Sequence, residues 1–292
     1  MSVKFIFVLV FRQLALSLMI EIPESTTIAW QAETILTGKK ISKVVQATSP
    51  HSFTWYNGDP KEYSKLLTGR TIESAIEHGA YVTLHCDNDT HIAISDGVNM
   101  KYYSSSEPHP KKHQLLIEFE DKNFLAFTVS MYGGIQAFKG ELDNPYYQGS
   151  LTKLSPLDES FDVAFFDQLF SSTKKDLSIK ALLATEQRIP GLGNGVLQDI
   201  LFLSGLHPKR KISTLTDLEK SDLFHCLKVT LKNMTDKGGR DTEKDFYGNK
   251  GGYKCILSKN TYKQLCPNCG GDIAKEAYLG GTVYYCSGCQ KL

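Results

Sequence analysis

The stretch CPNCGGDIAKEAYLGGTVYYCSGC, residues 266–289, decides how the end of this chain folds. It contains two Cys-x-x-Cys pairs, and 16 residues lie between the pairs. Two pairs at this separation are typical of a site in which four thiolates bind one zinc ion. The residues inside and after each pair are turn formers, which let both sulfurs of a pair face the same ion. Two disulfides in a secreted protein are the alternative.

Between the pairs, residues 277–279 and 282–285 have the pattern of short strands, and Gly280-Gly281 favours a tight turn between them. We therefore expect a zinc-finger β-hairpin that holds one structural Zn²⁺ ion. The predicted ligands are Cys266, Cys269, Cys286 and Cys289. The spacing predicts the metal but not its role, because zinc ribbons serve many kinds of partner.

Upstream of the hairpin, the periodicity of apolar residues changes twice. Residues 23–37 predict a helix with a proline in its first turn. Short β-prone runs separated by turn residues follow, at residues 81–85, 91–94, 115–119 and 124–127. Helical patterns then occupy residues 161–170, 179–186, 194–204 and 215–234. The expected fold class is α+β, with an N-terminal antiparallel β-sandwich and its flanking helix, a helical domain, and the zinc hairpin.

Charge is unevenly distributed along the 292 residues, although the net charge is only +1. Residues 207–292 contain 15 Lys and Arg against 9 Asp and Glu, whereas the first 206 residues contain 18 against 23. The chain as a whole is therefore not a polycation. Its basic C-terminal part indicates either an anionic partner or a solvated surface without a partner.

The first 18 residues form an apolar run that superficially resembles a secretory signal. Arg12 and Gln13 interrupt the run, no small-residue cleavage site follows it, and it is too short to span a bilayer. These features favour an N-terminal extension over a secretory signal. The extension is either part of the protein or the product of a wrongly assigned start, in which case translation begins at Met19. We therefore expect a cytoplasmic protein with no membrane partner.

A glycine-rich turn, GLGNG at residues 191–195, leads directly into the helix predicted at residues 194–204. Asn194 is a good N-cap, and the free N–H groups at a helix start suit a phosphate. The helix is followed by a basic cluster, GLHPKRK at residues 205–211. Helices joined by such turns can straddle a DNA backbone, although an ordinary helix–helix turn has the same pattern.

Taken together, these motifs occur in the order found in bacterial formamidopyrimidine-DNA glycosylases and endonuclease VIII, which the chain resembles over residues 19–292. They are LxGR at 67–70, KH at 112–113, GLGN at 191–194, GLHPKR at 205–210, GG at 238–239, DF at 245–246, and the two cysteine pairs. The resemblance implies a β-sandwich at 19–150, a helix–two-turn–helix domain at 151–250 and a zinc finger at 251–292, with residues 1–18 as an extension. It also implies binding of damaged or abasic double-stranded DNA in the cleft between domains, and excision of a flipped, oxidised base. We expect a monomer associated with a bacterial nucleoid.

In this family the chain begins MPELPE, and the secondary amine of the proline attacks the sugar C1′ to form a Schiff base. Residues 19–24 of this chain read MIEIPE. Glu21 and Glu24 match the two carboxylates, so the resemblance makes them the catalytic residues. Ile20, however, stands at the position of the nucleophilic proline. An internal Ile20 has only an amide nitrogen, which is not nucleophilic, and a chain starting at Met19 would carry its amine one residue away.

Other positions depart from the family in the same direction. The phosphate-contacting lysine of the sandwich falls at Ala80, and residues 128–133 lack the arginine that fills the gap left by the flipped base. The arginine of the zinc hairpin falls near Gly280-Gly281. The methionine that wedges into the duplex is also replaced, and Val98 or Met131 is the candidate for its role.

The residues fit two functions. One is a DNA glycosylase in which Glu21 activates a water that attacks the glycosidic carbon, with strand cleavage weak or absent. The other is a catalytically inactive relative that binds lesions. The carboxylate pair favours the first unless it only caps a helix, and the lost arginines favour the second. In both cases the resemblance retains a set of DNA-contacting residues, namely Lys112, His113, Asn194, Lys209 and Arg210.

Overall fold

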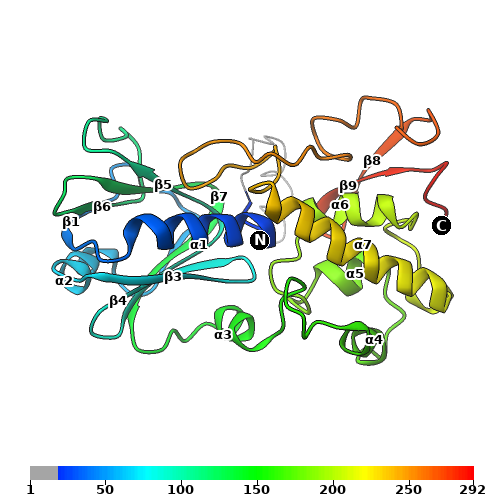
Figure 1. The fold of residues 1–292 in the computed structure, drawn as a ribbon, viewed down its shortest axis with the longest axis horizontal. Coiled ribbons are helices and arrows are strands. Elements are labelled where there is room, and N and C mark those ends of the chain that lie inside the picture. Colours follow the sequence, from blue (N-terminus) through cyan, green and yellow to red (C-terminus); the bar gives the residue numbers. More distant parts are fainter. Residues whose placement is uncertain (1–18) are drawn as a thin grey trace, which may run out of the picture.

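The computed structural model of the protein describes residues 19–292, and its two larger parts lie side by side (Figure 1). The N-terminal part contains α1 (Ile22–Leu36), β1 (Ile41–Gln46), β2 (Thr54–Tyr56), η3 (Pro60–Glu62), α2 (Tyr63–Leu67), β3 (Ile72–His78), β4 (Tyr81–Cys86), β5 (Thr90–Tyr103), β6 (Leu115–Phe119) and β7 (Phe124–Lys139). The helical part contains α3 (Pro145–Thr152), α4 (Val163–Ser171), α5 (Ile179–Ala184), α6 (Asn194–Leu203), η4 (Ile212–Thr214) and α7 (Asp217–Asp236). The terminal hairpin consists of β8 (Ile273–Tyr278) and β9 (Gly281–Cys286). The predicted α+β class is confirmed.

The seven N-terminal strands form one sheet in the order β1-β6-β7-β5-β4-β3, with β2 beside β7. The β2–β7 pair is parallel. The four runs predicted from the sequence correspond to β4, β5, β6 and β7, whereas β1, β2 and β3 were not predicted individually. The long strands β5 and β7 shift register between Asp96 and Val98, where a bulge bends the pair. Val44 of β1 and Ala75 of β3 come from opposite edges of the sheet, yet both belong to one buried core. The expected sandwich is therefore a single sheet that folds over its own core.

Helix α1 connects the two parts of the molecule. It begins directly after Glu21, with Pro23 in its first turn, and the carboxylate of Glu24 accepts a hydrogen bond of 3.2 Å from the main-chain nitrogen of Glu21. A proline and an acidic side chain at these positions are typical of a helix start. The buried face, which includes Ile28 and Leu36, packs in the core of the sheet. Because α1 contacts both β3 and α7, its first turn lies at the junction (Figure 1).

Helices α4 to α7 surround a second apolar core, which also contains Ile22 of α1. The predicted helices are all present, with small differences at their ends. Helix α5 ends at Ala184, two residues earlier than expected, because Thr185 has an extended backbone and Glu186 and Gln187 have positive φ angles of 58° and 49°. A left-handed backbone conformation cannot continue a right-handed helix. The chain then turns toward the start of α6.

The loop before α6 touches the sheet at a close approach of two main chains. Gly191 has a φ of +77°, and a side chain there would overlap the main chain of Gly79 and Ala80 in the β3–β4 turn. The main-chain nitrogen of Ile22 donates to Gly191 O at 3.1 Å, and Ser25 Oγ donates to Gly79 O at 2.5 Å. The first turn of α1 is therefore held between these two turns.

The terminal hairpin is attached to the side of α6. The side-chain nitrogens of Asn194 and Gln198 both donate to the carbonyl oxygen of Thr282, at 2.5 and 2.9 Å. Gln198 Oε1 also accepts a hydrogen bond of 3.0 Å from the main-chain nitrogen of Tyr284. Three bonds from one helix to one strand fix the position of β9 relative to the start of α6.

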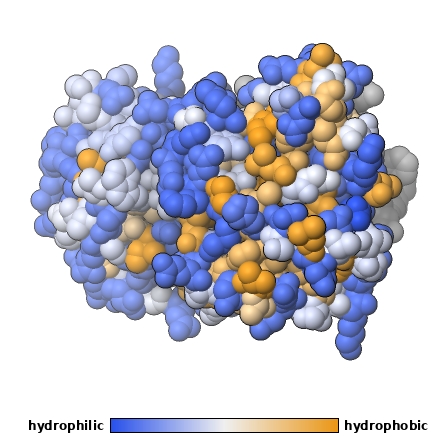
Figure 2. Space-filling model, turned by 45° about the vertical axis from the view of Figure 1, so that its right-hand side comes forward, coloured by the Kyte–Doolittle hydropathy of each residue, from blue (hydrophilic) through white to orange (hydrophobic). Residues whose placement is uncertain are grey.

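The surface differs between the two halves of the molecule. In Figure 2, hydrophobic side chains gather over the half that carries the helical part, whereas the sheet half is mostly hydrophilic. Exposed apolar side chains of the helical part include Val163, Leu203, Leu218 and Val229. From residue 19 to the C-terminus, no helix combines the length and the apolarity needed to cross a membrane.

Candidate functional site

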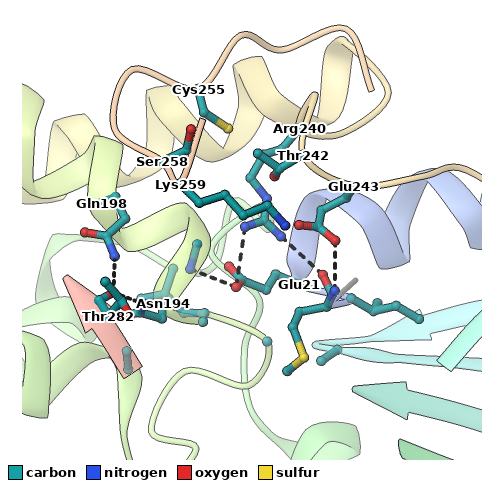
Figure 3. Close-up of a pocket in the computed structure, with 18 of the residues that line it drawn as sticks. Glu21, Asn194, Gln198, Arg240, Thr242, Glu243, Cys255, Ser258, Lys259 and Thr282 are labelled. Atoms are coloured by element: carbon teal, nitrogen blue, oxygen red, sulfur yellow. Dashed lines mark hydrogen bonds and ion pairs between the residues drawn. The ribbon is translucent and has the colours of Figure 1, made fainter. Parts of the chain in front are cut away.

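A cavity of about 540 Å³ lies where the first turn of α1, the turn before α6 and the loops following α7 meet (Figure 3). Its lining includes Met19, Ile20, Glu21, Asp96, Tyr132, Asn194, Arg240, Glu243 and Lys259. Two of the residues predicted from the sequence, Glu21 and Asn194, are therefore brought together in one cavity. Arg240, Glu243 and Lys259 join them from the C-terminal part of the chain.

Glu21 is only 6% exposed, and its carboxylate lies at the N-terminus of α6. Oε1 accepts a hydrogen bond of 2.9 Å from the main-chain nitrogen of Gly195, and Oε2 accepts one of 2.8 Å from that of Val196. Arg240 Nη1 lies 3.5 Å from Oε1. Burial raises the pKa of Glu21, while Arg240 and the two helix N–H groups lower it and so partly offset the effect. The side chain of Glu21 therefore caps α6, although Glu21 directly precedes α1.

The glycines of the GLGNG motif make this contact possible. A side chain at Gly193 would overlap the carboxylate of Glu21, and one at Gly195 would overlap the guanidinium of Arg240. Any Cβ at these two positions would push the carboxylate or the guanidinium away from the start of α6. The glycines of the motif are thus explained by the close approach of charged side chains to the N-terminus of α6. The sequence suggested a phosphate as a ligand there, but the carboxylate of Glu21 occupies this position.

Glu24 is 3% exposed and forms a buried ion pair with Arg240, which is 2% exposed. Arg240 Nη2 lies 2.7 Å from Glu24 Oε2, and Arg240 Nε lies 3.0 Å from Glu24 Oε1. The main-chain nitrogen of Arg240 also donates to Oε1 at 2.9 Å. This two-pronged geometry is the strongest form of the arginine–carboxylate pair. Glu24 does not line the cavity but holds Arg240 beside Glu21.

Glu243 is a third carboxylate at the cavity, and it follows Arg240 in the sequence by three residues. Glu243 Oε2 accepts a hydrogen bond of 2.8 Å from the main-chain nitrogen of Met19. Burial raises the pKa of Glu243 to about 7, with further raising contributions from Glu24 and Glu21 and lowering ones from Arg240 and the Met19 N–H. A carboxylate with this pKa exchanges protons near neutral pH.

The position of the family nucleophile is occupied by a fixed amide. Ile20 is 7% exposed, its side chain belongs to the core of the sheet, and its nitrogen donates to Asp96 O at 3.0 Å. The hydrogen bond and the buried side chain both fix the position of this nitrogen. An amide nitrogen in this setting has no lone pair available for attack on a sugar carbon.

Several predicted DNA contacts take part in bonds within the protein. Asn194 Nδ2 donates to Thr282 O, and its Oδ1 is buried without a partner in residues 19–292. Lys209 Nζ pairs with Glu276, and Arg210 Nη2 lies 3.1 Å from Glu219 Oε1. A phosphate that bound Lys209 or Arg210 would have to compete with these carboxylates.

The predicted Lys112 and His113 lie on the opposite part of the molecule and differ in exposure. The His113 ring is 3% exposed, with Nε2 at 3.1 Å from Gln46 O and Nδ1 at 3.2 Å from Pro110 O. The contact with Gln46 attaches the segment before β6 to β1, and the contact with Pro110 lies within that segment. Lys112 is exposed, with no ion pair to any residue from 19 onward. Of the two, only Lys112 presents a free cation.

Lys259 was not predicted from the sequence, although it is an exposed cation at the cavity. It extends from its loop toward the Arg240–Glu21 pair (Figure 3). Asp199 of α6 fixes the loop, because its carboxylate accepts hydrogen bonds from the main-chain nitrogens of Ile256 at 2.9 Å and Leu257 at 2.8 Å. Burial raises the pKa of Asp199 to about 6.

The prediction of a wedge at Val98 is wrong. Val98 is 1% exposed and packs in the core of the sheet, directly after the bulge that bends β5. Its side chain cannot enter a duplex without unfolding that region. Met131 is only partly buried, and its neighbour Tyr132 lines the cavity with a ring centroid 5.6 Å from that of Trp55. Trp55 is 50% exposed, so an aromatic pair lies at this edge.

The four predicted zinc ligands form a cluster at the base of the hairpin. Their sulfur atoms all lie within 4.8 Å of one another, with Cys266 Sγ 3.7 Å from Cys289 Sγ and Cys269 Sγ 3.4 Å from Cys286 Sγ. Sulfurs that bind one zinc ion tetrahedrally at about 2.3 Å lie about 3.8 Å apart, whereas the sulfurs of a disulfide lie about 2 Å apart. The cluster therefore fits a structural zinc ion, and the disulfide alternative does not agree with it.

Comparisons with known proteins agree with this arrangement. A model of the formamidopyrimidine-DNA glycosylase N-terminal domain matches residues 19–131. A formamidopyrimidine-DNA glycosylase from Bacillus cereus is 29% identical over 281 residues, spanning 92% of this chain and 98% of the relative. One from Bacillus subtilis is 27% identical over 291 residues, spanning 92% and 98%.

Solved structures show the same fold. The Lactococcus lactis Fpg (MutM) in complex with DNA containing an N7-benzyl-Fapy-dG has a TM-score of 0.79 at 22% identity, and the match covers 93% of this chain and all of that one. The match begins with Met19 in the family model, as the resemblance of residues 19–24 predicted. Residues 19–131 therefore belong to the formamidopyrimidine-DNA glycosylase N-terminal domain family, and the chain as a whole, with its four-cysteine hairpin at the expected place, is similar to these glycosylases over 92% of its length.

Proposed function

We propose that this chain binds damaged duplex DNA over the cavity and excises a flipped, oxidised base by hydrolysis of the N-glycosidic bond. Its lyase step is weak or absent. The observation that carries the proposal is the contrast between Glu21, whose carboxylate is retained in the cavity, and Ile20, whose nitrogen is bonded to Asp96 O at 3.0 Å. The charge needed for base excision is present, whereas the amine needed for a Schiff base is not.

Glu21 is the proposed charge-stabilising residue. Base excision creates positive charge at the sugar C1′, and a fixed carboxylate stabilises that charge without having to reorganise. Both oxygens of Glu21 already accept helix N–H groups, so they are poorly placed to take a proton from water. Glu24 acts through Arg240, which it holds by the buried ion pair. This assignment modifies the sequence-based prediction that Glu21 activates water.

Relatives of the chain support DNA as the partner. Another structure of the Lactococcus lactis Fpg is a complex with DNA containing an abasic site, with a TM-score of 0.80 at 22% identity. In this chain, the exposed cations Lys112 and Lys259 and the aromatic side chains of Tyr132 and Trp55 offer phosphate contacts and base-stacking surfaces. We expect it to act as a monomer in the bacterial cytoplasm at the nucleoid.

The second candidate function is binding of lesions without catalysis. It is favoured by the amide at Ile20 and by the internal ion pairs of Lys209 and Arg210. The two functions differ in one measurable quantity, which is the release of free base.

The test is single-turnover release of an oxidised purine or pyrimidine from a duplex, with the resulting abasic strand cleaved chemically afterwards. The full chain should release the base, and Glu21→Gln should lower the rate by at least ~100-fold, a size typical of a lost electrostatic contact in an active site. Glu120→Gln is the matched control, because Glu120 is an exposed carboxylate whose ion pair with Lys40 lies on the sheet. Lesion-specific binding without base release would favour the second function.

A further inference from the structure

Three acidic side chains surround Arg240, and they differ in how many of their oxygens are occupied. Both oxygens of Glu21 accept main-chain N–H groups, at 2.9 and 2.8 Å. Both oxygens of Glu24 accept from Arg240, and Oε2 also accepts from the Glu21 nitrogen. Glu243 differs, because only its Oε2 accepts a hydrogen bond, from the nitrogen of Met19. Glu243 Oε1 has no hydrogen-bond partner within the described part of the chain.

The free oxygen of Glu243 belongs to a side chain that lines the cavity. Figure 3 shows the carboxylate beside Arg240 and above the first residues of α1. Glu243 is 7% exposed, so its reach toward solvent is through the cavity. The bond from Met19 fixes one oxygen of the carboxylate and thereby orients the other. A carboxylate with one fixed and one free oxygen has the arrangement that a positioned proton acceptor needs.

The electrostatic surroundings make this carboxylate suitable for proton exchange. Burial raises its pKa to about 7, and Glu24 and Glu21 at the start of α1 add to the rise. Arg240 of its own loop and the Met19 N–H oppose that rise. The other charged groups at the cavity are Lys259 of the loop before the hairpin, Asp96 of β5 and Lys275 of β8. A general base works best when its pKa is near the working pH.

We propose that Glu243 is the proton-transfer residue of the cavity, acting through its free oxygen Oε1. The inference rests on the proposed hydrolytic function. A water molecule forms the new C1′–O bond as the C1′–N bond breaks, and Oε1 accepts the proton that the water loses. The departing base keeps the electron pair of the broken bond. Glu243 then returns the proton to the base nitrogen, so that the products are the neutral base and the abasic sugar.

This division of labour explains why the chain keeps three acids beside one arginine. Glu24 holds the guanidinium, Glu21 places a fixed charge near the sugar, and Glu243 exchanges the proton. Arg240 compensates part of the negative charge, which would otherwise be very costly in a buried site. Without a nucleophilic amine at residue 20, water is the remaining nucleophile, and water needs a base.

The experiment measures single-turnover base release by the full chain between about pH 5 and pH 9. The wild-type rate should rise with pH and level off above the pKa of Glu243. Glu243→Gln should be at least ~100-fold slower at pH 8, and its rate should lack the rise with pH on the acidic side of the profile, which we call the acidic limb. Binding to a duplex that contains a non-cleavable tetrahydrofuran abasic analogue should be unchanged. Glu120→Gln is the control for replacing a carboxylate by an amide away from the cavity.

A second variant separates chemistry from folding. Glu243→Asp keeps the carboxylate but withdraws it by one methylene, so it should keep the acidic limb at a reduced plateau even if Glu243→Gln folds poorly. An active Glu243→Gln with an unchanged pH profile, or a Glu243→Asp variant whose rate does not rise with pH, would overturn the role of Glu243 but leave the proposed function standing. Failure of the wild-type chain to release any base would overturn the proposed function together with this inference.

Discussion

The main-chain nitrogen of Ile20 lies 3.0 Å from the carbonyl oxygen of Asp96, to which it donates its hydrogen. This bond joins the segment before α1 to the bulge of β5, where the register of the sheet shifts. The side chain of Ile20 fills the core on the same side. The nitrogen at residue 20 is therefore part of a structural connection between these two segments.

Borohydride trapping on abasic duplex tests the loss of the lyase step. The full chain should give no trapped complex, because neither Ile20 nor Met19 carries an amine. A chain starting at Met19 should trap weakly, since its ammonium would lie 2.8 Å from Glu243 Oε2 and the carboxylate favours the charged, non-nucleophilic form. An Ile20→Pro variant with Met19 removed should gain trapping. Efficient trapping by the full chain would contradict this explanation.

Replacing Arg240 should destabilise the fold. Arg240→Ala leaves Glu24 and Glu21 buried without their counter-charge, and breaking such a pair costs about 3–5 kcal/mol. The free energy of unfolding in urea measures the loss. Lys232→Ala is the control, because the Lys232–Asp236 pair lies exposed on α7 and surface pairs contribute little. Equal effects of the two substitutions on the free energy of unfolding would show that the buried pair does not contribute much to stability.

Removal of one zinc ligand should loosen the hairpin and leave the sheet intact. In Cys269→Ala the cluster loses one of its four thiolates, so zinc content should fall and amide hydrogen exchange should accelerate in β8 and β9 but not in β4. Affinity for DNA should fall as well, because β9 is bonded to α6 beside the cavity. Cys226→Ala, at a free thiol on α7, serves as the control. Full zinc occupancy in Cys269→Ala would refute the assignment.

Stability should decrease as the pH rises from about 4.5 to about 7. The pKa of Glu243 rises from its ordinary value of 4.5 to about 7 in the folded protein. The folded state therefore binds the proton more tightly, and this contribution is complete below the unfolded pKa and lost on passing the folded one. Urea midpoints at pH 5 and pH 8 should differ less in Glu243→Gln than in the wild type. Part of the difference should persist, because burial also raises the pKa of Glu21.

DNA affinity should depend on salt through the exposed cations. Lys259→Ala and Lys112→Ala should each lower the slope of log affinity against log salt concentration by about 1, as expected when one phosphate contact is lost. Lys232→Ala should leave the slope unchanged, because that lysine pairs with Asp236 on α7. Slopes identical to that of the wild type for both variants would place the DNA on another surface.

Local patterns predicted the local structure well. The spacing of Cys266, Cys269, Cys286 and Cys289 was sufficient for the metal cluster, because turn residues and ligands lie within one short segment. Helix α1 was also predicted within a residue of its ends, since a proline, an acidic residue and a glycine mark them. In such cases the physical cause and the signal lie in the same stretch of chain.

Long-range contacts could not be predicted in this way. The role of Glu243 depends on Met19, which is 224 residues away, and that of Arg240 on Glu24, which is 216 residues away. Both residues lie in the stretch between the GG and DF motifs, so four charges within five residues were the only available signal. Strands β1, β2 and β3 were not predicted individually, and β2 has only three residues. Burial likewise excluded Val98 as a wedge, which spacing alone could not show.

The distance in sequence between Arg240 and the acids that it neutralises has a consequence for synthesis of the protein. The ribosome completes Glu21, Glu24 and the whole sheet long before residue 240 leaves the exit tunnel, and domains generally fold from the N-terminus onward during translation. During that interval the first turn of α1 has no guanidinium beside its carboxylates, so a nascent sheet must keep them in water or hold them protonated. The cavity is therefore the last part of the molecule to close, and any release of the chain before residue 240 yields a sheet with an acidic, unfinished edge.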